Sequence, residues 1–300
     1  MIYTVTLNPA LDYVVWLDEL QPGQLNRTTK GHTHPGGKGV NVSITLHTLG
    51  IPNQAIGFAG GTVGKALCEA LSSMGVPSEF LPPQEGETRI NVKVQAQEET
   101  EVNGNGPILC EENLRQLMQK LDVLRPGDVL VLAGSLPQGL AADTYQRLAE
   151  LAAQRGARAV VDTSGDVLEA ALKAKPFLIK PNRAELSGLL RRAMGTIEQV
   201  ERAAREVQQM GARNVLVSMD KGGAALLLED GTFISLPAPE GKTVNTVGAG
   251  DAMVAGFLAA LESSDDMQRA LRWGLAAGTA AACVPWMPTK KEIEAMLPRE

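Results

Sequence analysis

The 300-residue sequence predicts an α/β protein with a mainly parallel sheet in α/β layers. Short apolar runs without alternation are typical of strands that are covered on both faces. Amphipathic segments separate most of these runs, and four segments end in a glycine that is typical of a helix C-cap. The expected strands are residues 3–7, 55–59, 129–133, 159–162, 177–180 and 215–219, and the capping glycines are Gly50, Gly75, Gly156 and Gly211. We therefore expect ligands beyond the carboxyl ends of these strands.

Two stretches depart from this pattern and predict a small inserted sheet. Ile90, Val92 and Val94 alternate with polar residues, which is typical of antiparallel strands with one face in water. The second face of such a sheet could pack on a substrate, on another subunit or on both. The expected β-sheet lid comprises residues 11–35 and 87–105, and the expected core comprises residues 1–10, 36–86 and 106–300.

The composition excludes several classes of function. Lys and Arg number 28 against 34 Asp and Glu, so a net charge of −6 gives no positive field for nucleic acid or acidic membranes. The three cysteines lie far apart and lack the spacing of a zinc site or a disulfide framework, which favours a reducing cytoplasm. We expect neither export nor membrane insertion, because the first residues have no basic start and no run of apolar residues is long enough to span a membrane. His32 and His34 lack metal-type spacing, and we expect them at the surface of a lid strand.

Residues 245–251 carry the strongest local signal for chemistry. They have the sequence Asn-Thr-Val-Gly-Ala-Gly-Asp and precede a predicted buried helix. Small residues at a helix start leave backbone N–H groups free for a phosphate. Asp251 lies beside the helix N-terminus, where the macrodipole favours an ionised carboxylate that could accept a proton during phosphoryl transfer. Asp is also a preferred N-cap residue, so a purely structural cap is an equal alternative on this signal alone.

A second glycine-rich segment, residues 35–42, opens another predicted helix and lacks the Walker A spacing. Gly36 and Gly37 would let a sugar lie against the backbone. Lys38 and Asn41 would add a charge and a directional hydrogen bond for a phosphorylated sugar. A glycine turn with a solvated lysine is the structural alternative.

Together, these two segments resemble the two signatures of the PfkB, or ribokinase-like, carbohydrate kinases. The resemblance covers essentially the whole chain, including residues 6–12, 88–93, 133–137 and 180–185. It is strongest to the 1-phosphofructokinase group, and the tagatose-6-phosphate kinases come next. It implies a ribokinase-like three-layer core with a small β-sheet lid.

The resemblance implies a role for each matching position. Asp251 is the expected catalytic base, and the expected anion hole consists of the backbone N–H groups of Gly248, Ala249 and Gly250. A substrate dianion in a partly desolvated pocket needs more than one cationic donor, and Lys38 and Arg89 are the expected pair. A solvated charge on a lid strand is the alternative for Arg89. The full set of implied substrate-binding residues is Asp12, Arg27, Gly36, Gly37, Lys38, Asn41, Arg89 and Asn91.

On the nucleotide side, the resemblance implies contacts to ATP from Lys180, Asn182, Ser218 and Gly223. Glu185 completes an Asn-x-x-Glu arrangement and is expected to hold Mg²⁺ through water, since Mg²⁺ dehydrates reluctantly. An ordinary acid in the first turn of a helix is the alternative for Glu185. Asp220 departs from the family, where glycine is common. It would repel ATP phosphates unless it faces solvent or meets Mg²⁺.

The expected function is ATP-dependent phosphorylation of a ketohexose phosphate. The expected substrate is fructose 1-phosphate, and the expected product is fructose 1,6-bisphosphate. A tagatose-6-phosphate kinase or another PfkB sugar kinase is the first alternative, because a ketohexose monophosphate can present either end to the same base. A non-catalytic sugar-phosphate sensor is the alternative from another class, and its expected mark is loss of the base or of the anion-hole glycines. The resemblance also implies a homodimer through the lid.

Overall fold

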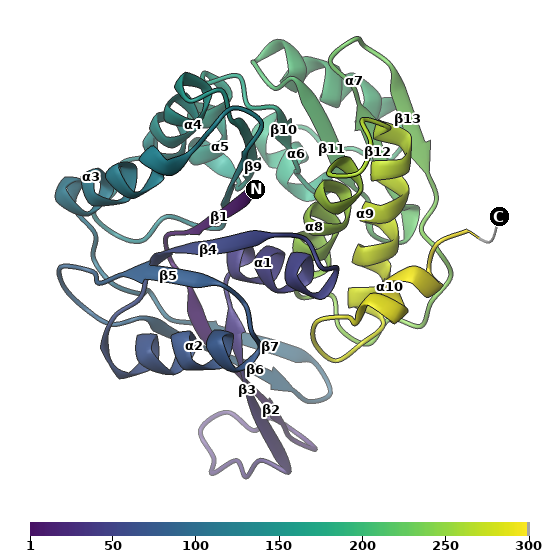
Figure 1. Ribbon diagram of the computed structural model, residues 1–300. Coiled ribbons are helices and arrows are strands. Elements are labelled where there is room, and N and C mark those ends of the chain that lie inside the picture. The colour runs from purple at the N-terminus through teal and green to yellow at the C-terminus, as the bar shows by residue number, and fades with distance from the viewer. Residues whose placement is uncertain (299–300) are drawn as a thin grey trace.

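The computed structural model describes residues 1–298 and shows a nine-stranded sheet between helices, with a second, smaller sheet beside it (Figure 1). Every neighbouring pair from β5 to β11 is parallel, and only β12 runs in the opposite direction, antiparallel to both β11 and β13. The predicted mainly parallel sheet is therefore confirmed. The order across the sheet is β13 (Phe233–Leu236), β12 (Ala224–Leu227), β11 (Asn214–Ser218), β10 (Leu178–Ile179), β9 (Arg158–Asp162), β8 (Val129–Ala133), β1 (Ile2–Thr6), β4 (Asn53–Phe58) and β5 (Ser78–Leu81).

Helices cover both faces of this sheet and so make three layers. In β8, Leu130 and Leu132 join one buried cluster, whereas Val129 and Val131 join the other. This alternation explains the unbroken apolar runs, because every side chain of such a strand is covered. The first cluster includes α3 (Glu111–Lys120), α4 (Thr144–Gln154), α5 (Gly165–Leu172), α6 (Arg183–Leu189) and α7 (Ile197–Gln209). The second includes α1 (Lys38–Thr48), α8 (Ala249–Leu261), α9 (Met267–Ala282) and α10 (Lys290–Ala295).

The helix ends follow the local sequence. Gly50, Gly75, Gly156 and Gly211 all have positive φ, between 72° and 140°, as expected for glycines that end helices. The expected strand at 177–180 is shorter in the structure, where the ladder covers only Leu178–Ile179. Helix α2 (Gly61–Ser73) packs against α1 in a third, small cluster, and two short 3-10 turns occupy Leu121–Val123 and Asp220–Gly222.

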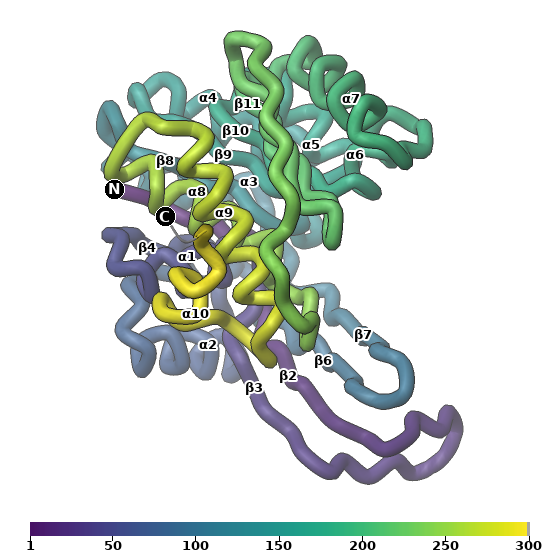
Figure 2. The backbone as a smooth tube through the Cα atoms, turned by 90° about the vertical axis from the view of Figure 1, so that its right-hand side faces the viewer, coloured from purple at the N-terminus to yellow at the C-terminus, as the bar shows by residue number. Residues whose placement is uncertain are grey.

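The second sheet, which we call sheet B, has the order β3 (Lys30–Gly36), β2 (Ala10–Trp16), β6 (Arg89–Gln95) and β7 (Glu99–Asn103). It projects from the core, with the β2–β3 loop at its far end (Figure 2). The expectation of antiparallel strands is wrong for the central β2–β6 pair, which is parallel. These two strands are joined through the core and not by a hairpin turn, so nothing local imposes an antiparallel pairing.

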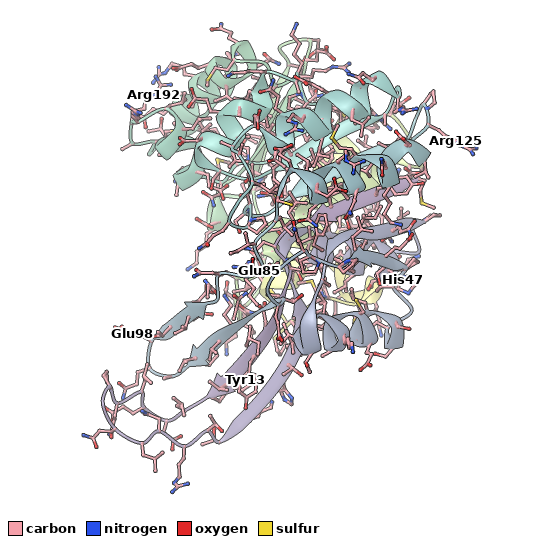
Figure 3. The ribbon with its side chains drawn as sticks, turned by 90° about the vertical axis from the view of Figure 1, so that its left-hand side faces the viewer. Tyr13, His47, Glu85, Glu98, Arg125 and Arg192 are labelled. Atoms are coloured by element: carbon pink, nitrogen blue, oxygen red, sulfur yellow. The ribbon has the colours of Figure 1, made fainter. Side chains whose placement is uncertain are left out.

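The two faces of sheet B differ in character. Asp12, Asn91 and Lys93 lie on the face directed toward the core. Apolar side chains on the opposite face are exposed, with Tyr13 at 39%, Ile90 at 46% and Val102 at 61%. Figure 3 shows Tyr13 on this sheet and Glu98 at the β6–β7 turn, both away from the helical layers. Among residues 1–298, no helix combines the length and apolar character needed to cross a membrane.

Helix α8 is held against α9 at very short range, and this contact fixes the position of Asp251 in its first turn. A Cβ at Gly256 would lie 2.5 Å from the Trp273 carbonyl oxygen and 2.7 Å from Ala277 Cβ. Only glycine allows the two backbones to approach in this way.

Replacing Gly256 with Ala should therefore lower the free energy of unfolding by about 1–3 kcal/mol, measured by urea denaturation. The matched control is Gly188→Ala in α6, an exposed helical glycine whose new methyl group would have no atom within 4 Å. This control should gain about 0.4–1 kcal/mol. Equal changes in the two variants would contradict the close approach of α8 and α9.

Candidate active site

The two glycine-rich segments of the sequence meet at the centre of the molecule. Helices α1 and α8, which follow these segments, lie side by side (Figure 1). Asn41 of α1 donates a hydrogen bond from Nδ2 to Asp251 Oδ2 at 2.8 Å. Both side chains are buried, at 6% and 5% exposure. The structure thus joins the predicted base to the predicted sugar-binding segment.

The start of α8 has the geometry of an anion site. Gly248 is in the left-handed region, at φ 80°, and turns the chain into the helix. Within the described residues, the N–H groups of Gly248 and Gly250 have no hydrogen-bond acceptor, whereas that of Ala249 makes a long 3.3 Å bond to Thr246 O. Lys180 Nζ lies 3.1 Å from the position that a Cβ on Gly250 would occupy. Two free N–H groups and a buried ammonium group therefore lie close together at the start of α8, as an anion site requires.

A second buried acid, Asp162, completes the charge arrangement and was not predicted. It ends β9, is fully buried, and accepts a 2.9 Å hydrogen bond from Lys38 Nζ. Its other oxygen lies 3.4 Å from Lys180 Nζ. Lys38 also lies 3.6 Å from Glu185 Oε1, so one lysine connects two acids. The position of Asp162 at the carboxyl end of a predicted core strand was the signal that could have identified it.

These charges separate the proton affinities of the two buried acids. The pKa of Asp251 is raised to about 7, first by burial and then by the nearby charge of Asp162. Burial would also raise the pKa of Asp162, but the charges of Lys180 and Lys38 outweigh it and hold this pKa below its ordinary value. The expectation that the helix N-terminus keeps Asp251 ionised is wrong in direction, because loss of water has the larger effect.

The sugar side of the site is built by β2 and β6. Asp12 Oδ1 accepts a 2.8 Å hydrogen bond from Asn91 Nδ2, and burial raises the pKa of Asp12. A Cβ on Gly36 would lie 2.6 Å from the Asp12 carboxyl group, and Gly37 has φ 112°. The glycine pair thus lets the backbone pass directly beside this acid, as expected.

Arg89 lies near Asp12 and keeps an N–H group that makes no hydrogen bond within residues 1–298. Its Nη1 donates to Gly104 O at 3.2 Å, whereas its buried Nε has no partner among the described residues. Burial lowers the pKa of Arg89, and the nearby charge of Asp12 opposes this shift. A half-buried guanidinium with an unused N–H is suited to bind an anion.

Two other predicted phosphate ligands lie elsewhere. Lys38 is paired with Asp162 and Glu185, and it is not among the described residues that line the pocket beside Asp12. Arg27 is exposed on the loop between β2 and β3, at the far end of sheet B. The structure therefore brings Arg89, Asn91 and Asp12 together and leaves Arg27 apart from them.

The predicted nucleotide residues gather at the carboxyl ends of β10 and β11. Lys180 is 4% exposed, and Asn182 caps α6 in a reciprocal capping box with Glu185. Ser218 forms a bridge to Asn182, and its N–H donates to Pro181 O at 3.1 Å. Gly223, at φ 87°, ends the short turn after β11.

Asp220 in this turn is exposed, so the solvent-facing alternative for this residue holds. A carboxylate in water repels a neighbouring phosphate only weakly, because solvent screens the charge.

A narrow pocket lies between the inner face of sheet B and the core. The expectation that His34 is a surface residue is wrong, because it is half-buried and lines this pocket. Trp286 and Lys93 line it as well and were not predicted. Alternation along a strand predicts two faces but does not indicate which face lines a pocket, so these side chains could not be placed from the sequence alone.

The chemistry that this arrangement supports is transfer of a charged group to an alcohol. A buried carboxyl group with a pKa near 7 can accept a proton, and free N–H groups with two lysines can stabilise negative charge. An acid and an amide on sheet B can bind the hydroxyl groups of the acceptor.

Comparison with known proteins agrees with this chemistry. The family described as "pfkB family carbohydrate kinase" matches residues 5–285. A 1-phosphofructokinase of Bacillus subtilis is 39% identical, over 99% of this chain and 98% of its own length. A D-tagatose-1-phosphate kinase of Bacillus licheniformis is 38% identical, over 94% of this chain and 92% of its own length.

A solved structure shows the same fold. The tetrameric inhibited form of phosphofructokinase-2 from Escherichia coli has a TM-score of 0.91 and 33% sequence identity. The match covers 98% of this chain and 97% of that chain. The similarity thus includes both the core and sheet B.

Proposed function

The chain belongs to the pfkB family of carbohydrate kinases, and from this premise we propose that it transfers the γ-phosphoryl group of ATP to the 6-hydroxyl of fructose 1-phosphate. The product would be fructose 1,6-bisphosphate. The observation that carries the proposal is the meeting of buried Asp251 with Asn41 and with the free N–H groups at the start of α8. The printed name of the Bacillus subtilis relative supports the choice of substrate.

In the proposed mechanism, Asp251 accepts the proton of the attacking hydroxyl group. A general base is most effective when its pKa lies near the working pH, and the pKa of about 7 meets this condition. The N–H groups of Gly248 and Gly250 would stabilise the charge on the transferred group. Lys180 lies beside Gly250 and would share this role.

For the acceptor, we propose that Asp12 and Asn91 bind sugar hydroxyl groups and that Arg89 binds the phosphate already present. The unpartnered Nε of Arg89 supports this role. The predicted lid, residues 11–35 and 87–105, contains most of sheet B and would cover the acceptor and exclude water. The presence of the base and of the anion-hole glycines favours catalysis over a non-catalytic sensor.

We also propose that ATP binds with Mg²⁺. Among residues 1–298, no three His, Cys, Asp or Glu side chains form a metal-binding group, which fits an ion held mainly by nucleotide phosphates and water. Asp162 Oδ2, which accepts no hydrogen bond, and Glu185 are the carboxylates that could bind that water. When bound, Mg²⁺ would neutralise charge on the phosphates.

A homodimer through sheet B is part of the proposal, because Tyr13, Ile90 and Val102 leave an apolar face uncovered. The related Escherichia coli enzyme is described as a tetramer in its inhibited form. A cytoplasmic location also remains a proposal, supported by the three unpaired cysteines of the described chain.

The second candidate substrate is tagatose 1-phosphate, which the name of the Bacillus licheniformis relative supports in place of the expected tagatose 6-phosphate. Fructose and tagatose differ only in configuration at C4. Both 1-phosphates would therefore present the same 6-hydroxyl group to Asp251.

An ADP-release assay should give the highest kcat/KM with fructose 1-phosphate, at least about tenfold above tagatose 1-phosphate, tagatose 6-phosphate and fructose 6-phosphate. A higher kcat/KM for another sugar would replace the proposed substrate.

Asp251→Asn should lower kcat by about 10²–10⁴ with the fold retained, because it removes the proton acceptor. Near-normal turnover in the variant would remove Asp251 from the role of base.

Glu185→Gln should raise the Mg²⁺ concentration needed for half-maximal activity by about tenfold or more, because it removes a carboxylate near the phosphates. The glutamine can still complete the capping box with Asn182. Glu292→Gln is the matched control, since Glu292 forms the same box with Thr289 on α10. An unchanged Mg²⁺ requirement in Glu185→Gln would assign Glu185 to helix capping alone.

A further inference from the structure

The segment between α9 and α10 contacts both halves of the site. Figure 2 shows this yellow segment next to β2 and β3 of sheet B. We propose that two of its residues, Trp286 and Met287, are positioning residues that hold the acceptor-binding sheet at a fixed distance from the anion hole. The proposal rests on the proposed function only in requiring that the acceptor binds between sheet B and α8.

The first contact joins the segment to sheet B. The rings of Trp286 and His34 stack with their centroids 4.5 Å apart and an interplanar angle of 14°. His34 on β3 is paired directly with Asp12 on β2, so the stacked ring neighbours the acid that is expected to bind the sugar. Trp286, His34 and Asp12 line the same pocket. A shift of Trp286 would therefore displace His34 and, through it, the acceptor side of the site.

The second contact joins the segment to the anion hole. Met287 packs so closely against Gly248 that a Cβ on this glycine would overlap Met287 Cε. Thr45 Oγ1 of α1, which donates to Asn41 O at 3.0 Å, lies 3.7 Å from Met287 Sδ. Met287 thus sits against the residue that turns the chain into α8, with α1 as its support.

Hydrogen bonds tie the same segment to the residues that lead into Gly248. Asn245 Nδ2 donates to Pro285 O at 3.1 Å, and next to this segment Val244 N–H donates at 2.7 Å to the carbonyl of Ala282, the last residue of α9. Asn245 Oδ1 in turn accepts from Val247 N–H at 2.9 Å. The segment and the anion-hole loop are therefore held as one unit.

This arrangement matters because phosphoryl transfer depends on in-line placement of two reactants. A displacement of about 1 Å can cost about a hundredfold in rate. If the stack between Trp286 and His34 is lost, sheet B keeps its own hydrogen bonds but loses an aromatic contact to the core. The acceptor hydroxyl should then be placed less accurately, and water should reach the transferred group more often.

The test compares Trp286→Leu and His34→Leu with Trp286→Phe, using the sugar phosphate that the wild-type enzyme phosphorylates best. Either leucine variant should raise KM for this acceptor and lower kcat/KM by about tenfold or more, within the range that misplacement produces. The fraction of ATP hydrolysed without transfer should rise, measured as phosphate released per sugar phosphorylated. Trp286→Phe keeps an aromatic ring and should recover most of the loss.

The double leucine variant should have the same kcat/KM as the more impaired single variant, because the two substitutions remove the same contact. Trp16→Leu is the matched control: Trp16 contacts His32 edge to face at 5.7 Å, and both residues belong to sheet B. This control should leave the ratio of hydrolysis to transfer unchanged. Thermal unfolding of each variant separates loss of positioning from loss of fold.

An unchanged ratio of hydrolysis to transfer in His34→Leu, which alters only an edge strand of sheet B, would overturn the proposal even if Trp286→Leu fails to fold. Multiplicative losses in the double variant, or an equal effect of Trp16→Leu, would overturn it as well. Because the acceptor is chosen by wild-type activity, failure with fructose 1-phosphate would refute the proposed substrate and leave this inference to be decided by the variants.

Discussion

The burial of two acids in one place is the constraint on which the rest of the site depends. Asp251 and Asp162 are both removed from water, and an unpaired buried carboxylate costs several kcal/mol. Lys38 and Lys180 offset this cost, but neither lysine belongs to the same element as either acid. Both lysines contact Asp162 and keep it ionised, whereas burial and the charge of Asp162 raise the pKa of Asp251. One acid is therefore a fixed negative charge and the other a proton acceptor.

The parallel sheet is what allows four elements to bring these charges together. The carboxyl ends of β9 and β10 deliver Asp162 and Lys180 to the same edge of the sheet, and α1 and α8 deliver Lys38 and Asp251 from one covering layer. The close approach of α8 to α9 at Gly256 then fixes the helix whose N-terminus forms the anion hole. Sheet B contributes the acceptor side from outside these layers.

Features that depend on local sequence were predicted well. The unbroken apolar runs gave the strands, and glycines followed by small or polar residues gave the starts of α1 and α8. The family resemblance implied that Asn41 and Asp251 serve one site, and the hydrogen bond between them is a finding of the structure.

Features that depend on tertiary packing were not predicted. Nothing local distinguishes Asp162 from any other acid after a strand, or shows that Lys38 pairs with it. The parallel pairing of β2 with β6 depends on how the chain crosses the core. Trp286 lies in an irregular segment without periodicity, so its stacking on His34 could not be inferred.

Burial and a neighbouring acid make Asp251 a proton acceptor near neutral pH. NMR titration of protein labelled with ¹³C at the aspartate carboxyl carbons measures this directly, with Asp251→Asn identifying the resonance. We expect one resonance that titrates at about pH 7 and is missing from the variant. If every aspartate resonance of the wild-type protein titrates in the ordinary acidic range, Asp251 is not such a proton acceptor.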